Sequence, residues 1–368
     1  MSTIFINGKF IAQRMTGVQR YAGQIVQALD ALSAEAGAAR MVLLCPPSGR
    51  PPLLRRIEVL IVGAAGLPLH VWEQLVLPWA ARSGLLLSLA GSAPLWAARQ
   101  WCTFHDAAVF DHPASYTWLF RAWYQPHFRW LARRAERLLT VSAHSRGRLA
   151  QRLHVAPGHM AIVPNGGDHF DAVQADGSVL KRLGLAKEGF LMAVGSRNPT
   201  KNIAVLMRAW AALPDRGDLQ LVLVGGDDAA VFAATGHTAA AAQVVHAGGV
   251  NDAQLKALYQ HALALVFPSL DEGFGLPPLE ALGLGCPVAA AQIGAMPEVC
   301  GDAVLYFDPH SAEAILAAMI RLKDDKVLRQ RLREAGPRRA AQWGWRQAAI
   351  KLQGLLAQAG AAGPGAQR

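Results

Sequence analysis

The chain has 368 residues, enough for two α/β domains of ordinary size, each with its own hydrophobic core. Its composition, 52% hydrophobic and 17% charged, is typical of a globular protein and excludes a disordered one. No uninterrupted apolar run reaches the roughly 18 residues of a membrane span, and Asn7 and Lys9 stand where a signal peptide would be apolar. We therefore expect a cytoplasmic protein.

The positive charge is concentrated in the first half of the chain. Residues 1–170 hold 17 Lys and Arg against 8 Asp and Glu, which gives +9 of the total +10. Such a surface suits nucleic acid, an anionic membrane surface or a phosphorylated acceptor. Nucleic acid is the least favoured of these partners, because no helix-turn-helix, zinc or aromatic RNA-binding signature accompanies the charge.

Strand and helix signals alternate through the first half. Short apolar runs predict strands at 2–6, 41–45, 59–62 and 138–141. Residues 18–32 have apolar side chains at helical spacing, so Gly17 lies between the first strand and a helix. An ordinary glycine turn is the alternative reading of Gly17. His105 follows a weaker strand signal, and a single histidine of this kind is more often structural than catalytic.

An aromatic and arginine-rich segment occupies residues 115–139. Five apolar residues predict an inward helical stripe: Phe128, Leu131, Ala132, Ala135 and Leu139. The same helix would carry Arg129, Arg133 and Arg137 on another face, at i, i+4 and i+8. A solvated basic face is one interpretation. A membrane headgroup boundary is the other, because amphipathic aromatic residues lie just upstream, at Trp118, Phe120, Trp123 and Tyr124.

The second half continues the alternation of strands and helices. Strands are predicted at 190–194, 219–224, 244–246, 262–267 and 288–290. Arg197 and Lys201 lie in the turn after the first of these strands. Residues 312–353 are predicted to be helical, with breaks at Pro337 and Gly344. No G-x-G-x-x-G motif is present, so a nicotinamide-binding fingerprint is not supported.

One stretch, residues 269–280, concentrates the chemistry of the chain. It follows the strand at 262–267 directly, and its two glycines let the backbone turn with N–H groups exposed before a helix that Pro277 favours. Exposed amides and the positive helix end together bind anions. Glu272 and Glu280 place two carboxylates around that site, although each could also be a solvated residue or a partner of the helix dipole.

The string E-G-F-G-L-P-P-L-E, from Glu272 to Glu280, closely resembles the Glu-x7-Glu signature of the retaining glycosyltransferases of family 4, which have the GT-B fold. T-G-V-Q-R-Y-A around Gly17, the pair His105-Asp106 and P-N-G-G-D ending at Asp168 resemble further motifs of that family. Lys201 matches the lysine of its R-K-N motif. Thr200 stands where that motif has arginine, and Arg197 is a candidate replacement.

The resemblance implies an α/β fold with two doubly wound, Rossmann-like domains facing a central cleft. Residues 1–170 would form the acceptor-side domain and 171–345 the nucleotide-sugar domain, with a helix and tail at 346–368 packing back on the first. Glu280 would hold the ribose, Glu272 the sugar hydroxyls, and His105 would approach the transferred sugar. The donor phosphates would meet Gly17, Arg197, Lys201 and the turn of Gly273, Phe274, Gly275 and Leu276.

The implied reaction is sugar transfer from a nucleotide-sugar, with retention at the anomeric carbon, to a lipid-linked or growing polysaccharide acceptor. GDP-mannose is the preferred donor. Amides and a lysine can stabilise a departing diphosphate, so neither metal nor cofactor is expected. The protein would be cytoplasmic or peripheral at the inner face of the membrane. The alternatives are a GT-B sugar-nucleotide epimerase and a non-catalytic protein that binds nucleotide or nucleic acid.

Overall fold

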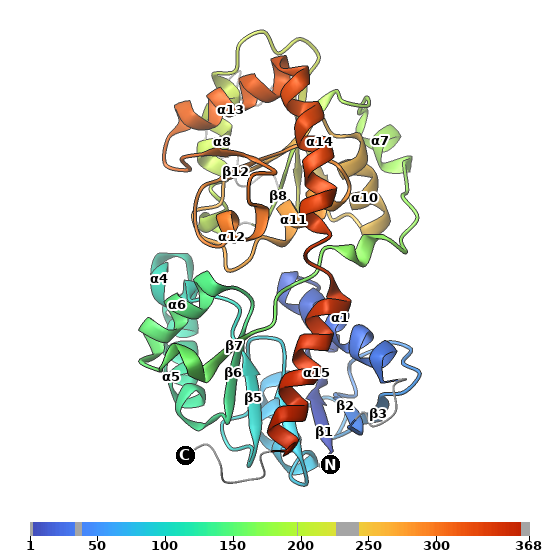
Figure 1. Cartoon of the computed structure of the whole chain (residues 1–368), viewed down its shortest axis with the longest axis vertical. Coiled ribbons are helices and arrows are strands. Elements are labelled where there is room, and N and C mark those ends of the chain that lie inside the picture. The colour runs from blue at the N-terminus through green and yellow to red at the C-terminus, as the bar shows by residue number, and fades with distance from the viewer. Residues whose placement is uncertain (1–2, 34–38, 197, 226–242, 362–368) are drawn as a thin grey trace. The chain divides into compact units, whose positions relative to one another are not determined.

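A computed structural model describes residues 3–33, 39–196, 198–225 and 243–361 of the chain (Figure 1). The chain divides into two compact units. Unit 1 comprises Met1–Gly166 and Trp345–Arg368, and unit 2 comprises Gly167–Gly344. The last segment of the sequence therefore belongs to the same unit as the first.

Within the described residues, unit 1 contains a parallel seven-stranded sheet in the order β3-β2-β1-β4-β5-β6-β7. Its strands are β1 (Ile4–Asn7), β2 (Met41–Cys45), β3 (Glu58–Ile61), β4 (Leu85–Ser88), β5 (Gln100–Thr103), β6 (Arg137–Thr140) and β7 (Met160–Ile162). Ile6 of β1 is in register with Leu43 of β2 on one side and Leu87 of β4 on the other. The chain winds outward from β1 in one direction and from β4 in the other, so the topological switch point lies between these strands.

Helices connect most strands of unit 1, and a last helix joins the unit after unit 2. They are η1 (Gly8–Ala12), α1 (Gly17–Leu32), α2 (Leu69–Val71), the π-helical turn η2 (Trp72–Val76), α3 (Leu77–Ala80), α4 (Ala108–Asp111), η3 (Pro113–Ser115), α5 (Trp118–Arg134), α6 (Ala143–Leu153), η4 (Pro157–His159) and α15 (Trp345–Ala361). Helix α15 packs on α1, where the rings of Tyr21 and Trp345 lie 6.0 Å apart (Figure 1). No helix among the described residues is both long and apolar enough to cross a bilayer.

The prediction for the arginine-rich segment is partly wrong. Phe128, Leu131 and Ala132 are buried as expected. Helix α5, however, ends at Arg134, because the chain leaves helical geometry at Ala135 and then joins the sheet. Arg137 therefore opens β6, with its guanidinium 5.9 Å from the Trp101 ring centre, and does not share a helix face with Arg129.

Unit 2 contains, in its described part, a second parallel sheet of six strands in the order β10-β9-β8-β11-β12-β13. The strands are β8 (Phe190–Val194), β9 (Gln220–Val224), β10 (Val244–Gly248), β11 (Ala264–Phe267), β12 (Val288–Ala291) and β13 (Leu305–Phe307). Leu191 of β8 pairs with Leu221 of β9 and with Ala264 of β11. The switch point of this sheet lies between β8 and β11.

Helices cover the sheet of unit 2. They are η5 (Asp168–Phe170), α7 (Ser178–Leu183), η6 (Pro199–Lys201), α8 (Ile203–Ala211), α10 (Asp252–His261), α11 (Leu276–Gly283), α12 (Met296–Cys300), α13 (Ala312–Asp324) and α14 (Lys326–Ala340). All residues of β8 and β11 are buried except Val194, which is partly buried. Parallel strands covered on both faces read as continuous apolar runs, which is why the sequence predicts them well.

The C-terminal helical region differs from its prediction in where the helices end. The helical segment breaks at Asp325, whose side chain accepts a hydrogen bond from Leu328 N and caps α14. Pro337 lies inside α14 and does not end it. The chain then passes Gly344, where a break was expected, and enters α15.

Candidate functional site

The loops that follow β8 and β11 are hydrogen-bonded to each other at the switch point of unit 2. Leu270 N donates to Thr200 O at 2.7 Å, and Asn202 Nδ2 donates to Pro268 O at 3.1 Å. Asn202 adopts the left-handed conformation, with φ 58°, which asparagine tolerates better than most residues. These contacts hold the end of η6 against the turn after β11.

Lys201 and Glu272 form an ion pair at this junction. Lys201 Nζ lies 2.5 Å from Glu272 Oε1, and the two side chains are 24% and 12% exposed. The ammonium also lies 5.7 Å from the centre of the Phe267 ring, a favourable distance for a cation and an aromatic ring. Two residues predicted to contact the donor therefore meet, and the ammonium remains partly accessible to solvent.

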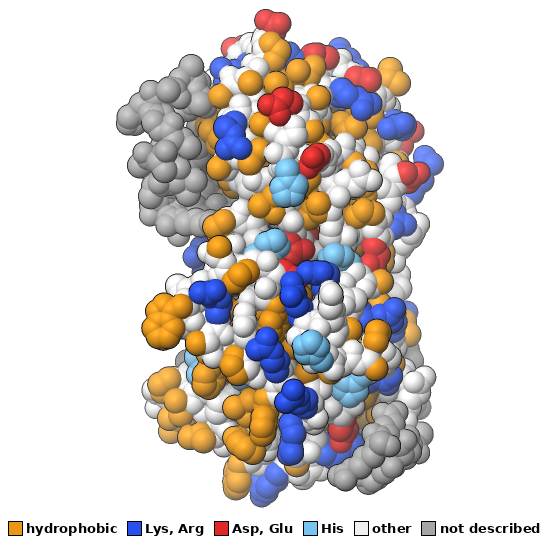
Figure 2. Space-filling view, turned by 90° about the vertical axis from the view of Figure 1, so that its left-hand side faces the viewer, with side chains coloured by type: hydrophobic (Ala, Val, Ile, Leu, Met, Phe, Trp, Pro, Cys, Tyr) orange, Lys and Arg blue, Asp and Glu red, His pale blue; other side chains and the backbone are white. Residues whose placement is uncertain are grey.

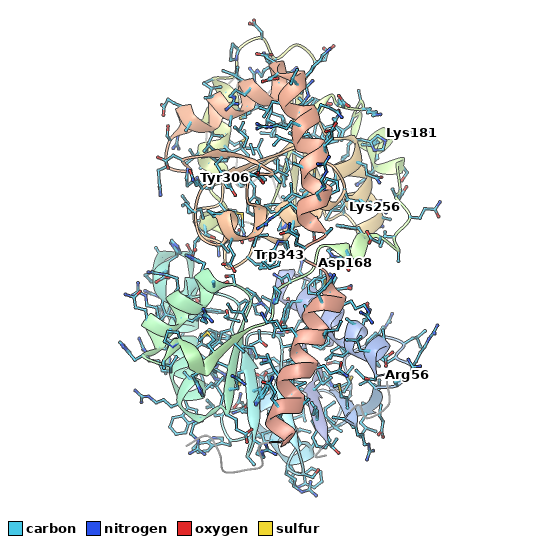
Figure 3. All side chains as sticks on the ribbon, viewed as in Figure 1. Arg56, Asp168, Lys181, Lys256, Tyr306 and Trp343 are labelled. Carbon is cyan, nitrogen blue, oxygen red and sulfur yellow. The ribbon has the colours of Figure 1, made fainter. Side chains whose placement is uncertain are left out.

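The glycine turn before α11 is tightly packed. Gly275 has φ 93°, and a side chain there would overlap the Met296 Cε atom. Gly294 has φ 57°, and a Cβ atom there would lie 2.7 Å from the Glu272 carbonyl oxygen. Tyr306, labelled in Figure 3, donates its hydroxyl proton toward the Met296 and Gly301 carbonyl groups. The backbone at Glu272 is thus fixed by neighbours that accept only glycine at two positions.

The N-terminus of α11 presents fewer amides than an ordinary helix. The helix begins at Leu276, and its next two residues, Pro277 and Pro278, have no backbone N–H group. The N–H groups at this end therefore belong to residues 273–276, the turn predicted to face the donor phosphates. The helix dipole adds positive potential at the same place.

The side chains of Phe274 and Leu276 are buried within unit 2. Phe274 is 4% exposed and packs edge-on against Trp343, which follows α14 (Figure 3), with ring centres 5.4 Å apart. Leu276 is 8% exposed. Both side chains anchor the turn, so a donor contact predicted for these two residues would have to come from their backbone.

Glu280 occupies a buried polar site in α11. Its side chain is 4% exposed, Tyr259 donates its hydroxyl proton to Oε2 at 3.0 Å, and His169 Nε2 lies 3.1 Å from Oε1. Tyr259 comes from α10 and His169 from η5, just after the start of unit 2. The carboxylate is thus held by side chains from two other segments of unit 2.

Thr200, which stands where the R-K-N motif has arginine, packs into the loop after β8. Thr200 is 7% exposed, its hydroxyl donates to Asn198 Oδ1 at 2.9 Å, and its carbonyl accepts from Leu270 N. The side chain at this position therefore points into the loop and away from solvent. Arg197, the candidate replacement cation, lies outside the described residues.

The P-N-G-G-D motif shows a similar local constraint. A Cβ atom at Gly167 would lie 2.8 Å from Cγ of Leu279 in α11. The Leu279 side chain fills the space that a larger residue at position 167 would need. Glycine there is consistent with the close approach of this loop to α11.

His105 lies in unit 1, directly after β5. Its Nε2 atom is 2.9 Å from the Leu89 carbonyl oxygen, and its ring meets Tyr21 edge-on with centres 4.9 Å apart. A carbonyl only accepts, so Nε2 carries the proton and Nδ1 is the acceptor nitrogen of the neutral ring. Burial lowers the pKa of His105, which favours the neutral ring.

Gly17 is the first residue of α1 and is exposed. A Cβ atom at this position would meet no other atom within 4 Å. Glycine is therefore not required by packing in unit 1. A ligand that approaches the backbone closely would explain the residue, as would a simple turn.

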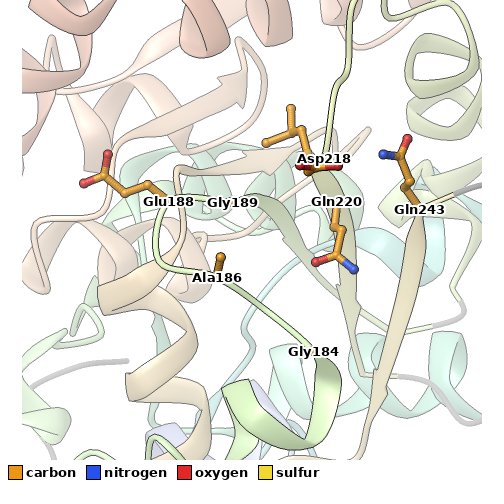
Figure 4. Close-up of a pocket in the computed structure, with 8 residues that line it drawn as sticks. Gly184, Ala186, Glu188, Gly189, Asp218, Gln220 and Gln243 are labelled. Carbon is orange, nitrogen blue, oxygen red and sulfur yellow. The ribbon is translucent and has the colours of Figure 1, made fainter.

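A pocket in unit 2 lies away from these residues (Figure 4). It is lined by Gly184, Ala186, Glu188, Gly189, Asp218, Leu219, Gln220 and Gln243. These residues lie near the amino ends of β8, β9 and β10, whereas Lys201 and Glu272 follow the carboxyl ends of β8 and β11. Ligands of doubly wound sheets bind outside the carboxyl ends at the switch point, so the pocket in Figure 4 is not the candidate site.

Sequence reasoning missed several residues that shape the site: His169, Tyr259, Gly294 and Met296. Each acts through a contact with a residue distant in the chain, such as Tyr259 with Glu280. Only His169 had a sequence signal, because it directly follows the P-N-G-G-D motif. The other three lie in segments with no distinctive motif.

Two doubly wound parallel sheets in separate units, with a lysine, a carboxylate and a glycine turn at one switch point, are the arrangement expected of a two-domain glycosyltransferase. The "Glycosyl transferases group 1" sequence family matches residues 180–339, and "Glycosyltransferase Family 4" matches residues 15–169. The chain belongs to the group 1, family 4 glycosyltransferases. The family and the fold class predicted from the sequence are thereby confirmed.

Individual proteins support this assignment. O-antigen chain mannosyltransferase B of Escherichia coli is 29% identical over 252 residues, which cover 66% of this chain and 66% of that protein. Sucrose-phosphate synthase from Thermosynechococcus elongatus has a TM-score of 0.78 at 20% identity, covering 98% of this chain and all of that chain. Anabaena HepE in complex with UDP and glucose has a TM-score of 0.74 at 16% identity, covering 97% and 100%. The solved structures establish the GT-B fold.

Proposed function

We propose that this protein transfers a sugar from a nucleotide-sugar to a polysaccharide or lipid-linked acceptor, with retention at the anomeric carbon. The observation that carries the proposal is the Lys201–Glu272 pair, with Nζ and Oε1 2.5 Å apart, beside the 273–276 turn. The ammonium and the backbone amides would stabilise negative charge on a departing diphosphate. Glu272 would accept hydrogen bonds from hydroxyls of the donor sugar.

In this assignment the described residues bind the donor without a metal or cofactor. That neither is needed stays a prediction. Lys201 and the turn amides would bind the diphosphate, and Glu280 would bind the ribose. His105 Nδ1 would accept a hydrogen bond from a hydroxyl of the transferred sugar, because Nε2 is engaged with Leu89. Retention rests on the family resemblance of the Glu272 to Glu280 string.

GDP-mannose is the proposed donor. The E. coli relative is named a mannosyltransferase, which supports mannose, whereas HepE was solved with UDP and glucose and therefore represents the rival base and sugar. A thermal-shift screen of GDP-mannose, UDP-glucose, UDP-galactose and ADP-glucose separates these options. We expect GDP-mannose to raise the melting temperature most, and stabilisation by a UDP-sugar alone would assign a different donor.

The reaction itself is tested by incubating the stabilising nucleotide-sugar with a lipid-linked acceptor extract. Release of nucleoside diphosphate together with label incorporation is expected. NMR of the product would then show the same anomeric configuration as the donor. An inverted product would disprove retention, and binding without any turnover would favour a non-catalytic nucleotide-binding protein.

We further propose that α5 contacts an anionic membrane surface that carries the acceptor. Trp118 is 68% exposed and Trp123 47% exposed, and Arg129 and Arg133 are exposed on the same helix. Figure 2 faces the side of unit 1 on which Figure 1 places α5, and hydrophobic and basic side chains both reach the surface there. Aromatic residues beside arginines suit the headgroup region of a bilayer.

A further inference from the structure

A buried ion pair lies at the switch point of unit 1, and the proposed donor chemistry does not use it. Lys9 Nζ is 2.6 Å from Glu73 Oε2, and the side chains are 3% and 1% exposed. Lys9 lies in η1, directly after β1, and Glu73 lies in the π-helical turn η2. Burying two charges is costly even when they are paired, and π-helical turns are frequent at functional sites.

Polar side chains from the ends of β1 and β4 surround this pair. Ser92 Oγ donates to Glu73 Oε1 at 2.7 Å and accepts from Lys9 Nζ at 3.2 Å. Asn7 Nδ2 donates to the same carboxylate oxygen at 3.1 Å. Ser92 lies in the loop after β4, and Leu89 of that loop accepts the His105 hydrogen bond. One short loop therefore joins the ion pair to the predicted catalytic histidine.

His127 adds an unsatisfied polar group to this region. Its side chain belongs to α5, the residue is 5% exposed, and neither ring nitrogen has a hydrogen-bond partner in the described part of the chain. The backbone of Ala93 lies close enough to the ring to raise its pKa, and the charges of Glu73 and Lys9 act on the ring as well. Buried polar groups in native proteins are normally paired, so two open ring nitrogens point to a missing partner.

The charge balance of the cluster indicates the chemistry of that partner. The ammonium of Lys9 and the carboxylate of Glu73 cancel. His70 Nδ1 lies 3.3 Å from Lys9 Nζ, and burial together with that ammonium lowers the pKa of His70. Burial lowers the pKa of His127 as well. With both rings neutral near pH 7, the cluster has no excess positive charge for a phosphate, whereas its donors and acceptors match hydroxyl groups.

We propose that Lys9, Glu73, Ser92 and His127 frame a binding site for the hydroxyl groups of a neutral sugar, the terminal sugar of the acceptor. Trp123 contributes an apolar face, since its ring centre is 5.8 Å from that of His127 and the residue is 47% exposed. The site lies at the carboxyl edge of β1 and β4, where doubly wound sheets bind ligands. The identification of the sugar as the acceptor rests on the proposed glycosyl transfer.

Substitution of His127 tests whether the cluster binds a ligand or only stabilises the fold. Because His127 has no hydrogen-bond partner, His127→Leu should leave the melting temperature unchanged or raise it. Saturation-transfer difference NMR would use methyl α-D-mannopyranoside, methyl α-D-glucopyranoside and inorganic phosphate as probes. We expect a glycoside to bind the wild-type chain and to bind His127→Leu about tenfold more weakly, the loss expected for about one hydrogen bond.

His159→Leu is the matched control, because His159 lies in η4 of the same unit and outside the cluster. This variant should bind the glycoside as the wild type does. Ser92→Ala provides a second test that removes a hydroxyl but no charge. Unchanged glycoside binding in a folded His127→Leu protein, binding of phosphate in place of glycosides, or no glycoside binding to the wild type would each overturn the proposal.

Calorimetry with nucleoside diphosphates on the same samples tests the proposed function separately from the proposed sugar site. The nucleotide should bind wild type and His127→Leu equally, because none of the residues assigned to it is His127 or another member of the cluster. Absence of nucleotide binding in the wild type would count against glycosyl transfer while leaving the glycoside result intact. Loss of both ligands only in His127→Leu would show a general folding defect, which Ser92→Ala would then resolve.

Discussion

Lys201 Nζ and Glu272 Oε1 are 2.5 Å apart although 71 positions separate the two residues in the chain. The carboxylate thus orients the ammonium. In the proposed function, the ammonium would move its hydrogen bonds to phosphate oxygens when the donor binds, while Glu272 would turn to sugar hydroxyls. The pair would therefore couple recognition of the two halves of the proposed donor.

Lys201→Ala should reduce kcat/KM by an amount equivalent to about 2–4 kcal/mol of transition-state stabilisation, because one preorganised charge partner is lost. Glu272→Ala should lose turnover but retain most nucleoside diphosphate affinity. Steady-state kinetics and calorimetry measure these effects, with Lys181→Ala in α7 as a control for loss of an exposed lysine (Figure 3). Nearly normal turnover in Lys201→Ala would reject its phosphate role.

Arg197→Ala should reduce kcat/KM less than Lys201→Ala does.

Glu280→Ala should weaken nucleotide binding, because its carboxylate is assigned to the ribose. Tyr259→Phe tests the support of that carboxylate, since it removes only the hydroxyl that donates to Oε2 at 3.0 Å. A hydrogen bond to a charged group contributes about 1.5–3 kcal/mol, so part of that free energy should be lost from folding or from nucleotide affinity. Calorimetry and denaturant unfolding distinguish the two. Equal nucleotide affinity in Glu280→Ala and the wild type would rule out the ribose contact.

Gly17→Ala should preserve stability but reduce activity. The added methyl group meets no protein atom within 4 Å, so only a ligand close to the α1 N-terminus would be displaced. Gly147→Ala in α6 is a matched control, because its surroundings are equally open. That control should be fully active and about 0.5–1 kcal/mol more stable, the usual gain inside a helix. Full activity in Gly17→Ala would leave Gly17 as an ordinary turn residue.

The lowered pKa of His105 predicts a loss of stability and activity on acidification. The unfolded chain takes up a proton near pH 6.5, whereas the folded chain does so only at lower pH. The unfolded state therefore binds more protons in this interval, and unfolding becomes easier as pH falls through it. Thermal unfolding and kcat/KM should be measured between pH 5 and 8. His105→Asn should show a shallower dependence of stability on pH, and an unchanged slope would contradict the assignment.

Binding to anionic vesicles should depend on the basic and aromatic face of α5. Arg129→Gln combined with Arg133→Gln should weaken co-sedimentation by about 1 kcal/mol per engaged arginine, and high salt should act in the same direction. Arg321→Gln with Arg331→Gln, on α13 and α14 of unit 2, removes the same charge and should leave binding unchanged. Equal losses in the two double variants would indicate a nonspecific charge effect and would exclude α5 as the membrane face.

The sequence by itself determined the class of fold and the family, because these depend on local signals. Buried parallel strands read as short apolar runs, and glycine and proline mark the turns that follow them, as at β11 and Gly275. The Glu272 to Glu280 string also fixes the order of carboxylate, turn and helix within one segment. Such patterns can be recognised without knowing which distant residues the segment contacts.

Only the tertiary structure decided which side chains meet. The pairing of Lys201 with Glu272, of Tyr259 with Glu280 and of Lys9 with Glu73 depends on how parallel strands bring their carboxyl ends to one edge of a sheet. No periodicity marks a lysine or glutamate as buried and paired. For the same reason the end of α5 at Arg134 was missed, because helical spacing in the sequence continued while entry into β6 ended the helix.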